Sequence, residues 1–271
     1  MPLSYTEWPP GPVLDRHVDR LWSLESKTPG TSAHCVYPDG CVELVIHLEE
    51  PIQRVTDNGT SSLKAAVVGQ LTGPIGLRLP GGVSTVGARF RPAGARPFLK
   101  MPLSAITGRS LSPTDVWGPA WVELQERLHD ARDRGTRISI LREALEHRLL
   151  DRAHRRREPF LQGVAAAGMR LSVRRAAAEA GVSVRTLERV FLSEVGLPPR
   201  HLRAILRFQA ALSRLAQAER KGLALFAVEC GYADQAHFAR EFRRFTGTTP
   251  AAFAAAAHPL SDRLVAARDG R

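Results

Sequence analysis

Two short stretches in the C-terminal part of the chain carry side chains that can read the edges of DNA bases. Arg185 and Arg189 lie in the first stretch, and Gln235 and Arg240 lie in the second. An arginine can donate two hydrogen bonds to O6 and N7 of guanine, and a glutamine can pair with N6 and N7 of adenine. The chemistry indicated is recognition of base pairs, provided that both stretches are helices that expose these side chains.

The first stretch belongs to a predicted helix-turn-helix unit. Ser172 can cap a short helix by accepting a backbone N–H, and Gly181 can adopt the left-handed conformation that ends it. Ser183 then caps a second helix, expected over residues 184–195. In a helix-turn-helix unit, the second helix presents its N-terminal residues to the major groove. The predicted inward face of this helix consists of Val184, Leu187, Val190 and Phe191.

The second stretch repeats this arrangement. Residues 223–230 form a short apolar helix, Gly231 makes the turn, and Asp234 caps the next helix over residues 235–245. Three aromatic side chains at positions i, i+4 and i+7 predict a buried stripe on that helix. They are Phe238, Phe242 and Phe245.

A further predicted helix begins at Pro198-Pro199 and joins the two units. One continuous helix would hold them at a fixed separation. The two second helices could then enter successive major grooves about 34 Å apart. Arg200, Arg203 and Arg207 lie on the polar side of this connecting helix and are expected near phosphates or solvent.

Residues 183–191, Gly196, Pro198-Pro199 and above all residues 230–250 resemble the DNA-binding domain of the AraC/XylS family of bacterial transcription regulators. The resemblance covers about one third of the chain and implies a DNA-binding domain over residues 160–257 that binds promoter or operator DNA. Where the family often has Tyr-Arg, this chain has Ala251-Ala252-Phe253, and Phe253 can supply the aromatic packing. The expected DNA-contacting residues are Arg185, Thr186, Glu188, Arg189, Arg200, Arg203, Gln235, Ala236, His237, Ala239 and Arg240.

The N-terminal part of the sequence has patterns typical of strands as well as helices. β-branched runs predict strands over residues 42–48, 65–69 and 83–90, and apolar residues spaced by three and four predict helices over 121–128 and 138–150. The fold class expected is therefore α+β: a β-rich domain over residues 1–150 with closing helices, followed by an all-helical domain. The charged run at residues 152–159 is the predicted boundary, an exposed linker that could also touch phosphates.

Residues 34–44 and 86–94 are similar to an N-terminal domain found on some members of the same family. This resemblance implies a sensor or dimerisation role, so further candidate partners are a small-molecule effector, RNA polymerase and a second copy of the chain. The candidate effector-binding residues are Trp22, His34, Tyr37, Glu43 and Arg89.

Charge and composition agree with a polyanionic partner. The formal net charge is +11, and residues 161–271 carry 17 basic and 9 acidic side chains against 21 and 18 in residues 1–160. Most of the cations are arginine, which a high-GC coding bias would also produce. Three cysteines, the lack of a signal-like N-terminus and the lack of a long apolar run argue against a disulfide scaffold, a secreted protein and a membrane protein. A cytoplasmic protein is expected.

Other interpretations remain open at this stage. His34, Cys35, Asp39, Cys41 and neighbouring residues could form a metal site or a thiol redox pair, but a turn and strand with small buried cysteines is favoured. No hydrolase, metalloprotease or phosphate-binding motif is present, so neither an enzyme nor a cofactor is expected. The alternative function is a ligand-binding protein whose helical domain docks a protein, which a weak dependence of affinity on salt would reveal.

Overall fold

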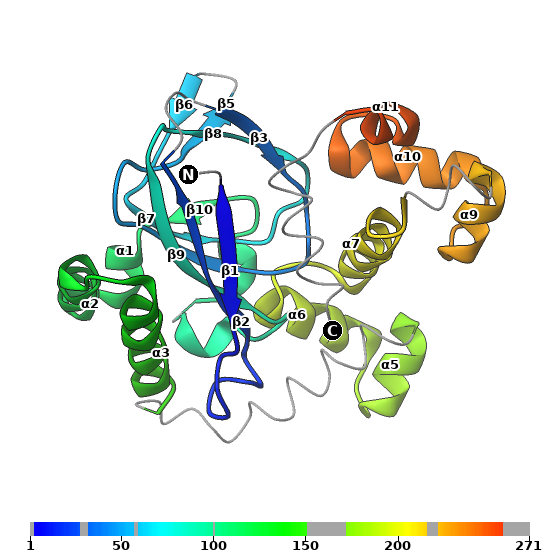
Figure 1. The fold of residues 1–271 in the computed structure, drawn as a ribbon. Helices are drawn as coiled ribbons and strands as arrows, with labels where there is room; N and C mark the ends of the chain where they lie inside the picture. Colours follow the sequence, from blue (N-terminus) through cyan, green and yellow to red (C-terminus); the bar gives the residue numbers. More distant parts are fainter. Residues whose placement is uncertain are drawn as a thin grey trace.

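The computed structural model describes residues 3–27, 32–56, 59–99, 101–150, 172–215 and 222–256. These residues form a β-rich N-terminal region and a helical C-terminal region (Figure 1), which confirms the predicted α+β class. The predicted linker at residues 152–159 and the predicted domain start at residue 160 lie outside the described residues.

The N-terminal region contains two antiparallel sheets. The first has six strands, in the order β1 (Ser4–Trp8), β2 (Val18–Ser26), β9 (Val83–Phe90), β4 (Glu43–His47), β7 (Ala65–Val68) and β10 (Ser110–Leu111). The second has four, in the order β3 (Ser32–Val36), β8 (Ile75–Leu79), β5 (Gln53–Thr56) and β6 (Gly59–Ser61). Strands β4, β7 and β9 confirm the three strand predictions.

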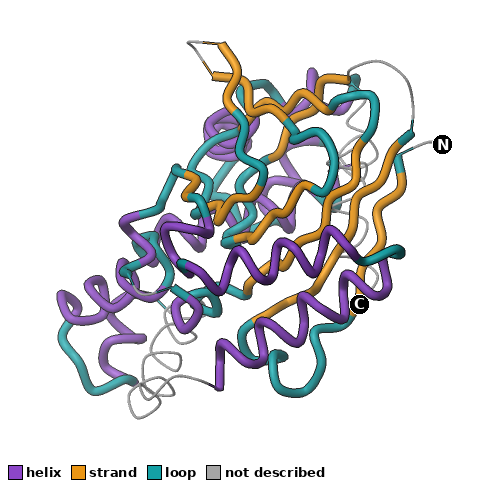
Figure 2. The backbone as a smooth tube through the Cα atoms, turned by 90° about the vertical axis from the view of Figure 1, so that its left-hand side faces the viewer, coloured by secondary structure: helices purple, strands orange, loops and turns teal. Residues whose placement is uncertain are grey.

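The six-stranded sheet is covered on both faces. Trp22 and Val45 on one face pack with Leu77 and Leu79 of the four-stranded sheet. The opposite face packs against α1 (Pro113–Trp117), α2 (Pro119–Asp130) and α3 (Arg134–Leu150). In Figure 2, helices lie in front of the strands on this side of the molecule. Helices α2 and α3 confirm the two closing helices. Short 3-10 turns, η1 (Arg96–Phe98) and η2 (Leu103–Ala105), follow β9.

The C-terminal region consists of α5 (Val173–Glu179), α6 (Val184–Glu194), α7 (Pro199–Leu212), α9 (Leu223–Glu229), α10 (Gln235–Thr246) and α11 (Pro250–Ala254). The caps form as predicted at Ser172, Ser183 and Asp234, whose side chains accept backbone N–H groups. Gly181 and Gly231 adopt positive φ angles of 64° and 80°, so each ends its helix and starts the turn.

One continuous core joins the two helix-turn-helix units. Leu187 and Phe191 from the first unit and Phe238 and Phe242 from the second are fully buried in the same cluster, with Phe208 of α7. The ring of Phe208 lies 5.6 Å from that of Phe242 at an interplanar angle of 69°. Helix α7 therefore fixes one unit relative to the other, as the sequence predicts.

The N-terminal and C-terminal regions are in direct contact. Thr107 Oγ1 donates to the carbonyl of Gly196 at 2.6 Å, just after α6. The ring of Tyr37 lies 5.3 Å from that of Phe253 in α11, and Tyr37 is buried in the helical core. Phe253 thus supplies the aromatic packing expected of it. The N-terminal region touches the end of the first unit and the last helix of the second.

Candidate nucleic-acid interface

The first turn of α6 is organised by its cap. Ser183 Oγ accepts the backbone N–H of Thr186 at 3.1 Å and also hydrogen bonds with the Thr186 hydroxyl at 2.9 Å. Arg185 and Arg189 are exposed, and Glu188 is half-buried. The N-terminal end of a helix carries partial positive charge, so this turn can attract the negatively charged DNA. The Thr186 hydroxyl already hydrogen bonds with Ser183, so Arg185 and Arg189 are the most available hydrogen-bond donors at this end of α6.

The inward face of α6 differs from the prediction at one position. Leu187 and Phe191 are fully buried and Val190 is half-buried, but Val184 is 39% exposed. Val184 is the first residue of the helix, and its side chain lies beyond the edge of the core. It adds an apolar contact point beside Arg185.

Helix α10 presents a second polar edge. Asp234 Oδ1 accepts the backbone N–H of His237 at 2.6 Å, and this cap leaves Gln235 and Ala236 exposed in the first turn. Arg240 is exposed one turn further along, and Ala239 is partly buried beside it.

The His237 side chain packs against the turn that precedes α10. Its ring packs edge-on against Tyr232 with 5.3 Å between centroids, and its Nδ1 accepts the backbone N–H of Ala233 at 3.4 Å. Its side chain is 36% exposed. The position expected to face DNA is therefore also part of the packing that supports α10.

The arginines on these two edges differ from those elsewhere in the molecule. Within the described part of the chain, Arg185, Arg189 and Arg240 form no ion pair with a carboxylate. An unpaired, exposed guanidinium keeps its donors available for a base or a phosphate. Arg200, in the first turn of α7, is likewise exposed, whereas Arg203 is half-buried.

Arg207, which was expected near phosphates or solvent, forms an ion pair within the protein. Its guanidinium donates to both carboxylate oxygens of Glu241 at 2.8 Å and lies 4.6 Å from the centre of the Tyr232 ring. Burial raises the pKa of Tyr232, so its phenol stays protonated. The Arg207 side chain is 28% exposed, so part of it still reaches water. It connects α7 to α10 through Glu241.

Four of the five candidate effector residues line one cavity in the N-terminal region. They are Trp22, Tyr37, Glu43 and Arg89. His34 does not line it: its Nε2 hydrogen bonds with Ser32 Oγ at 2.9 Å on β3. The cavity also reaches Tyr5, Val45, His47 and Gln209, which sequence reasoning missed. The alternation of β4 could have identified two of these, since Val45 and His47 share a face with Glu43.

The cysteine expectation is only partly met. Cys41 is half-buried, but Cys35 is exposed on β3, which contradicts a buried position. No cluster of three metal-binding side chains occurs within the described ranges. Across those same ranges, no helix combines the length and apolarity that spanning a membrane requires.

Two family models match the chain. The family described as "Domain of unknown function (DUF6597)" matches residues 6–112, and the family described as "Helix-turn-helix domain" matches residues 176–256. No curated protein matches the sequence significantly.

Solved structures with a similar chain trace have low sequence identity. ToxT from Vibrio cholerae, crystallised with an unsaturated fatty acid, is 12% identical with a TM-score of 0.42, over 86% of this chain and 93% of that chain. The AraC-like transcriptional activator CuxR is 12% identical with a TM-score of 0.33, over 84% and 86% of the two chains.

The family match over residues 176–256 coincides with the part of the chain that contains α6, α7 and α10. It also coincides with the residues that carry the resemblance to AraC/XylS regulators. The capped helices, the glycine turns and the exposed arginines agree with that assignment. Residues 176–256 are therefore a helix-turn-helix domain of the AraC type, the kind of domain by which transcriptional regulators bind DNA.

Proposed function

We propose that the protein recognises a specific DNA sequence by placing α6 and α10 in two successive major grooves. The observation that carries this proposal is the pair of exposed, unpaired polar edges on the two helices, with Arg185 and Arg189 on one and Gln235 and Arg240 on the other. Each edge begins at a capped N-terminus, which is the end that a helix-turn-helix unit directs at base edges.

The two helices are expected to make different contacts. Arg185 and Arg189 suit guanine, and Gln235 suits adenine, each contact being worth about 1–3 kcal/mol of discrimination. Ala236 and Ala239 are small enough to meet thymine methyl groups. The first helix therefore depends on charged donors, and the second combines polar and apolar contacts.

Rigid spacing supports simultaneous reading of two grooves. The shared core around Phe208 and the Arg207–Glu241 ion pair hold α10 on α7. Arg200 and Arg203 on α7 are assigned to the phosphate backbone between the two sites. Contacts of this kind position the protein without reading sequence.

We also assign residues 1–150 a regulatory role. Their contacts with the helical region at Gly196 and Phe253 give them a physical connection to both units. A change in the N-terminal region can therefore alter the placement of either recognition helix.

The direct test measures binding of the full-length chain to duplexes selected from random DNA and to scrambled duplexes, across a salt series. Selected duplexes should bind at least 100-fold more tightly, and log affinity should fall with log salt at about −0.9 per neutralised phosphate. Arg132→Ala, an exposed arginine in the N-terminal region, serves as the matched control and should change neither quantity. A chain that binds every duplex equally would contradict sequence-specific recognition.

A further inference from the structure

A cavity of about 450 Å³ lies inside the N-terminal region, between its two sheets. Strands β2, β4 and β9 supply one wall, β3, β5 and β8 supply the other, and Gln209 and Leu212 of α7 close one side. Its volume lies within the range of small-molecule binding sites.

The walls of the cavity are mostly apolar. The four-stranded sheet contributes Val36, Ile75 and Leu77, and the six-stranded sheet contributes Leu24 and Val45. A ligand that fills this space is stabilised by the apolar surface that it buries. The larger part of the ligand must therefore be hydrocarbon.

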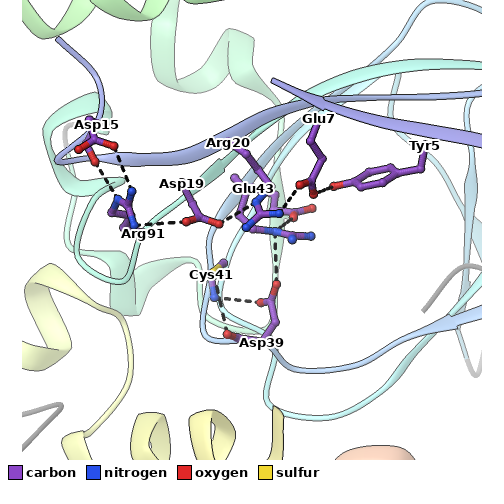
Figure 3. Close-up of polar contacts among 10 residues, drawn as sticks. Tyr5, Glu7, Asp15, Asp19, Arg20, Asp39, Cys41, Glu43 and Arg91 are labelled. Carbon is purple, nitrogen blue, oxygen red and sulfur yellow. Dashed lines mark hydrogen bonds and ion pairs between the residues drawn. The ribbon is translucent and has the colours of Figure 1, made fainter. Parts of the chain in front are cut away.

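The charged groups at the polar end of the cavity are already paired with one another (Figure 3). Arg89 is 3% exposed, its Nε donates to Glu43 Oε1 at 2.7 Å, and the same atom lies 3.6 Å from Asp39 Oδ2. Glu43 and Asp39 are labelled in Figure 3. These two carboxylates raise the pKa of Arg89 well above its usual value despite its burial. Adding a carboxylate here would place a third negative charge beside Arg89, and adding an ammonium would place a second positive one.

Neighbouring groups add no free charge at this end. Arg20 pairs with Glu7, whose other oxygen accepts the Tyr5 hydroxyl at 2.8 Å. Burial lowers the pKa of His47 to about 4, so its imidazole is neutral near pH 7. Arg54 also lines the cavity, from strand β5 between β8 and β6, and its side chain is half-buried, so part of it reaches water. The inner part of the cavity is therefore suited to an uncharged molecule.

Two hydrogen-bond donors in the wall have no acceptor. Arg89 Nη1 and Trp22 Nε1 are buried, and neither has a partner among the described residues. A buried donor without an acceptor is destabilising, so a ligand oxygen that reaches either donor contributes more to binding than an exposed hydrogen bond would. Both atoms are covered in this structure, so a small shift of the indole ring or the guanidinium must accompany that contact. The wall of the cavity therefore lacks a hydrogen-bond acceptor for these two donors.

From these observations we propose that the cavity binds an uncharged, largely apolar molecule with a carbonyl oxygen directed at Arg89 and Trp22. The matching ligands are ketones, lactones and amides with a hydrocarbon tail. The carbonyl satisfies a donor without adding charge, and the tail fills the space between the two sheets.

The same cavity is connected to the DNA-binding region. Gln209 lines it and donates from Nε2 to the carbonyl of Pro38 at 2.6 Å. Gly40, in the adjoining loop, lies so close to α7 that an added Cβ would be 2.8 Å from Leu202 Cδ1. Its φ of +80° also favours glycine at this position. A ligand that shifts this loop therefore acts directly on α7, which carries both recognition units.

Isothermal titration of the full-length chain with three probes of equal length tests the proposal. The probes are 2-decanone, decanoate and decylammonium, each below its micelle-forming concentration. The ketone is expected to bind at least tenfold more tightly than either charged probe. Equal or tighter binding of decanoate or decylammonium, or no binding of the ketone at 0.5 mM (roughly 4.5 kcal/mol of affinity,), would overturn it.

Two variants locate the site. Val45→Phe places a ring in the cavity and should abolish ketone binding. Trp22→Phe removes one donor and should weaken ketone binding about fivefold, while Trp121→Phe, the same change in the core on the other side of the sheet, should not. Circular dichroism checks folding, and Trp22→Phe remains decisive if Val45→Phe does not fold.

Undiminished ketone binding by Val45→Phe, or equal weakening by the two tryptophan variants, would place the ligand elsewhere. Binding is measured without DNA, so this proposal and the DNA-reading proposal fail independently.

Discussion

Replacing Arg207 by alanine should destabilise the protein without weakening its phosphate contacts. The side chains of Arg207 and Glu241 are 28% and 12% exposed, and they share a two-pronged ion pair. Removing one partner of a fully buried pair costs about 3–5 kcal/mol, whereas exposed pairs contribute about 0–1 kcal/mol. This half-buried pair should lie between these limits, so we expect a loss of about 2 kcal/mol.

Part of that loss comes from Glu241. Without Arg207, its carboxylate stays largely buried and unpaired, and the contact of the guanidinium with the Tyr232 ring disappears as well. Removing both charges together, in Arg207→Met with Glu241→Met, should recover most of the stability because no unpaired charge remains. For a helical domain of this size, 2 kcal/mol corresponds to about 10 °C in melting temperature.

The assay combines thermal unfolding with a salt series of DNA binding. Arg207→Ala should lower the melting temperature of the helical region and leave the slope of log affinity against log salt unchanged. Arg203→Ala should flatten the slope by about 0.9. If Arg207→Ala flattened the slope and left the melting temperature unchanged, Arg207 would be a phosphate contact and the structural assignment would be refuted.

Further variants test other parts of the structure. His47, with its pKa lowered to about 4, binds a proton more weakly when folded than when unfolded, so stability should fall as pH drops from about 6.5 toward 4. By pH 5 this amounts to at most about 2 kcal/mol, and unfolding of His47→Gln should show a correspondingly smaller loss. Gly87→Ala places a Cβ 2.4 Å from the Trp22 ring and should cost about 1–3 kcal/mol, measured by chemical denaturation. Thr107→Val removes the hydrogen bond to Gly196 and should lower stability by about 1 kcal/mol in the full chain; an unchanged melting temperature would argue against that contact.

The helical region could be predicted closely because its signals are local. Caps such as Ser183 and Asp234, and turns such as Gly181, act on neighbouring residues and are visible in the sequence. The recognition edges then follow from the helical period. The ion pair of Arg207 could not be predicted because its partner Glu241 lies 34 positions away, and only the packing of α10 on α7 brings the two side chains together.

The β-rich region could be predicted only in part because its contacts are distant. Strand β2 has buried residues on both faces, so it lacks the alternation that identifies a half-exposed strand. The cavity joins Trp22, Glu43 and Arg89 through the register of three strands, and Gln209 through contact with another region. Sequence spacing does not contain this information, which explains why His34 was included and Gln209 was missed.

The central claim is that α6 and α10 read separate parts of one DNA site. Its most direct test is selection of bound sequences from random DNA by the unaltered chain, Arg189→Ala and Arg240→Ala. Each variant should lose preference at one or two base pairs, and the two affected positions should lie about one helical turn apart, roughly 10 base pairs. If both variants bound every sequence more weakly by the same factor, with unchanged preference at every position, the two helices would contact only phosphates and the claim would be wrong.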